Sequence, residues 1–157
     1  MNTLLICIQN ESDAMAALID VLKLEQAALT QAPSLELMEE INALTLKKNQ
    51  MIGSITQLGK LRRNEVARLG HQITDSPEPQ WLQDQSQKDG WNKLISFTKK
   101  ANELNRVNGL LINKHLLRNQ STLQVLYKNH QNSSAPALYG ANGQSNASRS
   151  MMRGFVV

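Results

Sequence analysis

Hydrophobic residues recur at intervals of three and four along three stretches of this chain, and clusters of helix-breaking residues separate the stretches. Such spacing places apolar side chains on one face of an α-helix. In the first stretch this face consists of Met15, Leu18, Ile19, Leu22 and Leu29. We expect the helix to begin near Ser12 and Asp13, which are suitable N-caps, and to end near Gln31, before Ala32-Pro33. Residues 1–10 are apolar without a clear period, so whether they extend this helix stays open.

The second stretch predicts a helix from a cap at Ser34 to Leu69, with Gly70 as its stop. Its apolar residues alternate in steps of three and four, which is typical of a coiled-coil-like seam. They are Leu37, Ile41, Leu44, Met51, Ile55 and Leu58. Lys48 occupies one position of this seam. A helix of about 36 residues would be about 54 Å long.

A connection over residues 71–90 carries Pro77, Pro79 and Trp81 and predicts the second break between helices. We expect Asp89 to open a third helix of about 40 residues that runs to about Tyr127. Its first apolar residues are Trp91, Leu94, Ile95, Phe97, Ala101 and Leu104, and Val107, Leu111, Leu116, Leu117, Leu123 and Leu126 continue the pattern.

These patterns predict an all-α fold in which three long, coiled-coil-like helices form an antiparallel hairpin or bundle. From Gln131 the composition changes to Ser, Asn, Gly and Pro with few apolar residues, which indicates a flexible tail. We therefore expect a helical bundle domain over residues 1–130 and a disordered C-terminal tail over residues 131–157.

Polar side chains form a stripe within the third apolar stretch. Asn105, Asn108, His115 and Asn119 follow one another at intervals of three, seven and four, and Gly109 lies among them. Asparagine at a helix–helix seam fixes register at some cost in stability. The same stripe would also suit recognition of a partner's backbone, and both interpretations remain open. If Asn108→Leu changed the binding of a partner without changing stability, the stripe would be a recognition surface.

The formal net charge of +4 is unevenly distributed. Residues 1–103 carry 11 Lys and Arg against 13 Asp and Glu, whereas residues 104–157 carry six basic residues and no acidic one. A basic segment is compatible with nucleic acid, but these charges lack an interleaved set of aromatic residues. An acidic protein surface is an equally suitable partner.

No pattern indicates catalysis, a cofactor or a metal site. The three histidines, His71, His115 and His130, are far apart and share no metal-ligand spacing. The single Cys7 is expected to be a small buried hydrophobe. No segment approaches the roughly 20 apolar residues of a membrane span, and no signal sequence is evident, so we expect a cytoplasmic protein.

Two motifs carry a family resemblance. Asn105 to Leu111 read Asn-Arg-Val-Asn-Gly-Leu-Leu, with Trp91 fourteen residues upstream of Asn105. Leu138 to Gln144 read Leu-Tyr-Gly-Ala-Asn-Gly-Gln. These residues resemble the Asn-x-x-Asn-Gly-x-Leu and Leu-Tyr-Gly-x-x-Gly-Gln motifs of the FlgN family of flagellar type III export chaperones. The resemblance spans nearly the whole chain, but the terminal residues Met151 to Val157 depart from it.

The resemblance implies a chaperone that binds the C-terminal helical segments of the hook–filament junction proteins FlgK and FlgL. It implies that the chaperone prevents their premature assembly and presents them to the export gate protein FlhA. The residues it assigns to binding these substrate proteins are Asn105, Asn108, Gly109, Leu111, Ile112, His115, Asn119 and Leu123. It assigns gate docking to Leu138, Tyr139 and Gly140.

Two other functions remain as alternatives. One is a coiled-coil adaptor or oligomer that uses the leucine seams, and the other is a basic nucleic-acid-binding module whose affinity would fall steeply with salt. Whether the chain is a monomer or a homodimer stays open.

Overall fold

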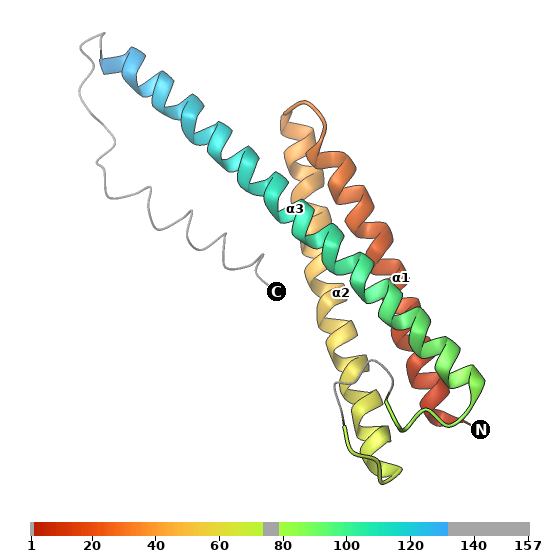
Figure 1. Cartoon of the computed structure of the whole chain (residues 1–157). Helices are drawn as coiled ribbons and strands as arrows, with labels where there is room; N and C mark the ends of the chain where they lie inside the picture. Colours follow the sequence, from red (N-terminus) through yellow and green to blue (C-terminus); the bar gives the residue numbers. More distant parts are fainter. Residues whose placement is uncertain (1, 74–78, 132–157) are drawn as a thin grey trace. The chain divides into compact units, whose positions relative to one another are not determined.

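The computed structural model describes residues 2–73 and 79–131, and within these residues all regular structure is helical (Figure 1). Helix α1 spans Thr3–Leu29, α2 spans Leu35–Arg68 and α3 spans Gln85–Gln131. The expected all-α fold of three long helices is therefore confirmed. The tail expected from residue 131 lies almost entirely outside the described residues.

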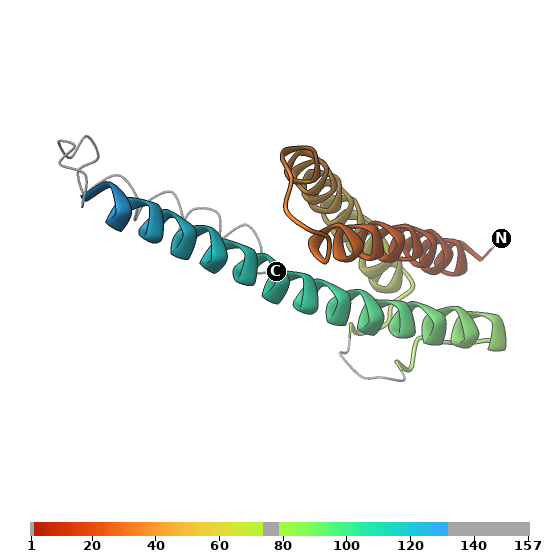
Figure 2. The same cartoon turned by 90° about the horizontal axis from the view of Figure 1, so that it is seen from above.

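The chain divides into two compact units, Met1–Asn108 and Gly109–Val157, and the boundary lies within α3. The described residues of the first unit are called the bundle below. Residues Gly109–Gln131 of the second unit are called the α3 extension. In the bundle, α1 and α2 form an antiparallel hairpin, and the part of α3 up to Asn108 packs on it (Figures 1 and 2).

Helix α1 begins much earlier than expected. Asn2 is its N-cap, and the Asn2 side-chain oxygen accepts a hydrogen bond from the Leu5 backbone N–H at 3.2 Å. Leu4 and Ile8 are fully buried in the core, so the apolar residues before Ser12 belong to the helix. Of the two alternatives left open for residues 1–10, the structure shows that Thr3 to Asn10 extend the helix, so Ser12 and Asp13 are not its caps and α1 has 27 residues rather than about 20.

The hairpin turn and the end of α2 follow the predicted signals. The Ser34 hydroxyl accepts a hydrogen bond from the Leu37 N–H at 3.1 Å, which confirms Ser34 as the N-cap of α2. After Arg68 the chain turns through Gly70, whose φ of +81° lies in the left-handed region that glycine adopts readily. Both ends of α2 are therefore specified locally, and the helix has 34 residues.

Helix α3 begins four residues before the predicted Asp89. The Asp84 carboxylate accepts a hydrogen bond from the Gln87 N–H at 2.8 Å, which is the contact that an N-cap makes. Asp84 also accepts a hydrogen bond from the Asn2 side-chain amide at 3.1 Å, which connects the N-terminal ends of α1 and α3. The helix extends to Gln131 and has 47 residues rather than about 40.

Helix α1 is the central helix of the bundle. Twelve of its residues are buried, whereas α2 has four buried residues. The core contains residues of all three helices and of the connection before α3: Leu4, Ile8, Met15, Leu18, Ile19, Leu22, Val66, Trp81, Trp91, Leu94 and Ala101. Gly59 and Gly90 permit close approach, because a Cβ at either position would lie 3.2 Å from Glu11 Oε1 or Ile8 Cγ2, respectively.

Candidate functional site

Two ion pairs, one buried and one partly buried, set the register of the α1–α2 hairpin. Glu25 of α1 pairs with Lys48 of α2 at 2.9 Å, and Glu11 pairs with Arg62 at 2.6 Å. The two glutamates are fourteen residues apart, and so are the two basic residues. Both pairs therefore belong to one antiparallel alignment, two heptads apart. A shift of either helix would leave buried charges without partners, which costs several kcal/mol.

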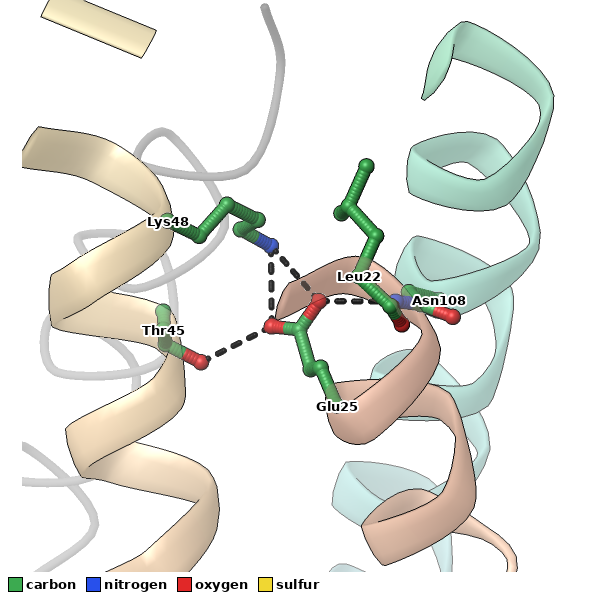
Figure 3. A network of polar contacts seen from close by, with 5 residues as sticks. All are labelled: Leu22, Glu25, Thr45, Lys48 and Asn108. Atoms are coloured by element: carbon green, nitrogen blue, oxygen red, sulfur yellow. Dashed lines mark hydrogen bonds and ion pairs between the residues drawn. The ribbon is translucent and has the colours of Figure 1, made fainter. Parts of the chain in front are cut away.

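The Glu25 carboxylate is the centre of a polar cluster that joins all three helices (Figure 3). It has no exposed surface and accepts four hydrogen bonds. The Lys48 ammonium donates at 2.9 and 3.2 Å, the Thr45 hydroxyl at 3.0 Å and the Asn108 amide at 2.8 Å. The same Asn108 nitrogen also donates to the Leu22 carbonyl at 2.9 Å. We call these side chains of Glu25, Thr45, Lys48 and Asn108 the polar latch.

The polar latch accounts for the second asparagine of the predicted stripe. Asn108 is 0% exposed, and its amide bonds to two groups of α1. The buried Asn108 side chain is not accessible to a partner protein in this structure. Its hydrogen bonds hold the bundle part of α3 in register on the hairpin. The upstream Asn105 is partly buried. Within the bundle, Asn108 therefore has a structural role, because it bonds α3 to α1.

The α3 extension presents a different surface. Leu111, Ile112 and His115 are partly buried, as is Gly109, whereas Asn119 and Leu123 are exposed. The extension also exposes Leu110, Leu117, Val125, Leu126 and Tyr127, each at least 45% accessible. Of the predicted substrate-binding residues, all except Asn105 and Asn108 lie on this segment. The predicted gate-docking residues Leu138, Tyr139 and Gly140 lie outside the described residues.

Helical periodicity gives the α3 extension one continuous apolar seam. Positions three and four apart share a face of a helix, and the residues on this face are Ile112, Leu116, Asn119, Leu123 and Leu126. Counting back by sevens from Asn119 and Ile112 leads to Asn105, and the same face includes the buried Leu94, Ala101 and Asn108. We call Ile112, Leu116, Asn119, Leu123 and Leu126 the seam.

A shallow groove lies elsewhere, on the bundle. It has a volume of about 350 Å³, and Met15, Ile55, Trp91, Leu94 and Ile95 supply its apolar lining. The Arg62 guanidinium lies 4.8 Å from the centre of the Trp91 ring while it pairs with Glu11, which fixes it at the edge of this groove. Nothing in the groove assembles a set of reacting groups.

The remaining groups to consider are the Cys7 thiol and the possible metal ligands of the described residues. Cys7 is partly buried. The pKa of its thiol is raised mainly by this burial and, to a smaller extent, by the negative charges of Glu65 and Glu11. A thiol of raised pKa is a poor nucleophile at neutral pH. Within residues 2–73 and 79–131, no group of His, Cys, Asp and Glu could hold a metal ion. No helix in the same part of the chain is long and apolar enough to cross a membrane.

Sequence reasoning missed most of the polar latch. It identified Lys48 as a polar residue on the α2 seam and Asn108 as part of a stripe, but not Glu25 as the group that joins them. The signal was present, because Glu11 and Glu25 occupy positions of the same three–four pattern that holds Leu4, Ile8, Met15, Leu18, Leu22 and Leu29. A charged residue at such a position requires an opposite charge on the facing helix.

Comparison with known proteins gives a consistent result. The family model described as FlgN protein matches residues 1–147, which include all three helices and Leu138 to Gly140. The flagella synthesis protein FlgN of Escherichia coli is 31% identical over 137 residues, which cover 84% of this chain and 85% of that protein. Its namesake in Proteus mirabilis is 46% identical over 66 residues, covering 42% of this chain and 41% of that protein. The Salmonella typhimurium protein is 29% identical over 109 residues, or 69% of this chain and 67% of its own. No solved structure matches the chain.

Proposed function

Because the chain belongs to the FlgN family of flagellar synthesis proteins, we propose that it is a cytoplasmic flagellar export chaperone. Its substrates in this proposal are the C-terminal helical segments of the hook–filament junction proteins FlgK and FlgL. It prevents their premature assembly and delivers them to the export gate protein FlhA. Tyr139, with Leu138 and Gly140, is the proposed gate-docking segment.

The observation that carries this proposal is the seam of the α3 extension, in which Asn119, Leu123 and Leu126 are exposed and Ile112 and Leu116 are partly buried. Helix α1 ends at Leu29, four residues after Glu25, whereas α3 continues for 23 residues after Asn108. The apolar pattern that is buried in the bundle therefore continues past the latch with exposed leucines. Surfaces of this kind bind an amphipathic helix through anchors at spacings of three, four and seven.

The chemistry of the seam supports a helical protein segment as its ligand. Ile112, Leu116, Leu123 and Leu126 supply hydrophobic anchors, and Asn119 supplies an amide that fixes the register of a partner helix. The positions beside the seam carry His115 and Tyr127, followed by the uncharged polar residues Asn113, Gln120, Thr122, Gln124 and Asn129, and none of them is Asp, Glu, Lys or Arg. Binding through the seam should therefore depend mainly on apolar burial and only weakly on salt.

The proposal is tested with a double variant, Leu123→Ala with Leu126→Ala, titrated calorimetrically with the C-terminal segment of a junction protein. Each buried leucine contributes about 1.5–3 kcal/mol, so affinity should fall by at least about tenfold. The matched control is Leu46→Ala with Leu61→Ala on α2, because Leu61 and Leu123 are both 57% exposed. Equal affinities of the two double variants would rule out the seam as the substrate site.

Gate docking is tested separately. Tyr139→Ala should abolish binding to the gate protein and slow secretion of the junction proteins, while the affinity for the substrate segment stays unchanged. Loss of substrate binding with gate binding intact would assign Tyr139 to the other partner.

A further inference from the structure

The basic residues of the α3 extension lie together on the face opposite the seam. At about 100° per residue, Lys114 and Lys128 point about 160° away from the mean direction of the five seam residues, and Arg118 points about 120° away. All three side chains are exposed. Lys114 and Arg118 are neighbours at a spacing of four, so two of the charges share one patch. The seam itself carries no charged residue.

The same opposite face also exposes apolar side chains. Leu110 lies four residues before Lys114, Leu117 lies three residues after it, and Val125 lies seven residues after Arg118, so all three neighbour basic residues on this side of the helix. Their exposed fractions are 56%, 63% and 59%. We call Leu110, Lys114, Leu117, Arg118, Val125 and Lys128 the basic face.

No carboxylate of its own unit balances the basic face. Residues 109–157 contain no Asp or Glu, so the basic side chains lack an acidic partner within the second unit. In the bundle, by contrast, Arg62, Arg68 and Arg106 each pair with a glutamate. A surface of one charge sign interspersed with leucines is complementary to a surface that is both acidic and apolar.

We propose that the basic face is a second docking surface and that its occupant is an acidic amphipathic helix of another protein. The leucines and Val125 would pack against the apolar stripe of that helix, and the three basic residues would pair with carboxylates that flank the stripe. Charges beside an apolar seam select partners in this way in helix–helix recognition. The α3 extension would then bind two partners on opposite faces, one through the uncharged seam and one through the basic face.

Two other classes of partner fit the observations less well. Helices that lie on membranes concentrate Trp, Phe and Leu on one face and cations on the other, whereas here leucines and cations share a face without an aromatic residue among them. Single-stranded RNA is bound by cationic grooves combined with aromatic stacking platforms, and the basic face has none. Both classes are retained as outcomes of the test.

The test uses the full chain and two synthetic helical peptides that share a leucine seam. The first peptide carries Glu at the flanking positions, and the second carries Gln there. The key variant is Lys114→Glu with Arg118→Glu and Lys128→Glu. Its matched control, Lys47→Glu with Lys60→Glu and Lys100→Glu, makes the same change in net charge at exposed positions of the bundle. Circular dichroism establishes that both variants keep their helix content.

The unmodified chain and the control should bind the Glu peptide at least about tenfold more tightly than the Gln peptide, since three charge pairs add to apolar contact. The preference should disappear in the key variant, and it should shrink between about 0.1 M and about 1 M salt, where the Debye length falls from about 10 Å to about 3 Å. Equal affinity for both peptides, or an unchanged preference in the key variant, would overturn the proposal.

Two further probes test the excluded classes. Tighter binding to vesicles of phosphatidylcholine and phosphatidylserine, or to a single-stranded RNA oligonucleotide, than to the Glu peptide would also overturn the proposal. The test does not depend on the function of the seam, because the Leu123→Ala, Leu126→Ala variant should keep its preference for the Glu peptide. Failure of the seam proposal would leave this result intact.

Discussion

The bundle part of α3 and the α3 extension are consecutive parts of one helix, yet asparagine differs between them in burial and in hydrogen bonding. Asn108 and Asn119 lie on the same face of α3. Asn108 is fully buried and donates two hydrogen bonds to α1, whereas Asn119 is exposed. The role of an asparagine in a helical stripe is therefore decided by the contacts of its own side chain and not by the stripe itself.

The two parts also differ in how their charges are held. The polar latch of the bundle buries an ion pair whose carboxylate accepts four hydrogen bonds, and it holds the bundle part of α3 on the hairpin. The extension exposes Lys114, Arg118 and Lys128, and it exposes the seam leucines Leu123 and Leu126.

The largest expected effect comes from breaking the latch. Lys48→Met would leave the buried Glu25 carboxylate without its cation, and removal of one partner of a buried pair costs about 3–5 kcal/mol. The free energy of unfolding of the bundle, measured in urea, should fall by that amount. The double variant Glu25→Leu with Lys48→Met should recover most of the loss, because no buried charge then remains.

The matched control for this change is the exposed pair in α3. Arg106 contacts Glu103 at 2.7 Å, and both side chains are about 60% exposed. The Arg106 guanidinium lowers the pKa of the Glu103 carboxyl through a side-chain hydrogen bond, but water surrounds the pair. Arg106→Met should leave stability unchanged within error. A loss as large as that of Lys48→Met would mean that burial does not distinguish the two pairs.

A smaller effect should separate the two asparagines. Asn108→Leu removes one donor from the Glu25 carboxylate and one from the Leu22 carbonyl, which should cost about 1–3 kcal/mol of unfolding free energy. Asn119→Leu changes an exposed position and should stay within about 0.5 kcal/mol. Asn119→Leu should instead alter the affinity for the substrate segment. Equal destabilisation by both variants would remove the distinction between the two parts of α3.

Local signals in the sequence were sufficient for the fold class and for α2. Ser34 and Gly70 act through their own backbone contacts, so their roles could be predicted without the rest of the chain. The start of α1 could not be predicted as easily, because Glu11 interrupts the apolar pattern that begins at Leu4. That glutamate becomes an acceptable core-facing residue only when Arg62 of α2 is placed opposite it.

The candidate site was predictable in part for the same reason. The α3 extension was predicted as a place of partner binding from its motif and its apolar periodicity, and this stays a prediction. The exclusion of Asn108 from that surface depends on Leu22 and Glu25, which are more than 80 residues away in the sequence. Periodicity identifies which residues share a face, but it does not show how far along that face the facing helices extend.

The smallest expected effect compares a glycine of the bundle with a glycine of the extension. A Cβ at Gly109 would meet nothing within 4 Å, so Gly109→Ala should stabilise the helix by about 0.5–1 kcal/mol. At Gly59 the added Cβ would lie 3.2 Å from Glu11 Oε1, and that carboxylate is already held by Arg62 at 2.6 Å. In Gly59→Ala, the gain from the higher helix propensity of alanine should therefore be offset by strain in the Glu11–Arg62 ion pair. Hydrogen exchange of the surrounding amides should slow in Gly109→Ala and not in Gly59→Ala, and equal slowing at both sites would show that the close contact at Gly59 carries no energetic cost.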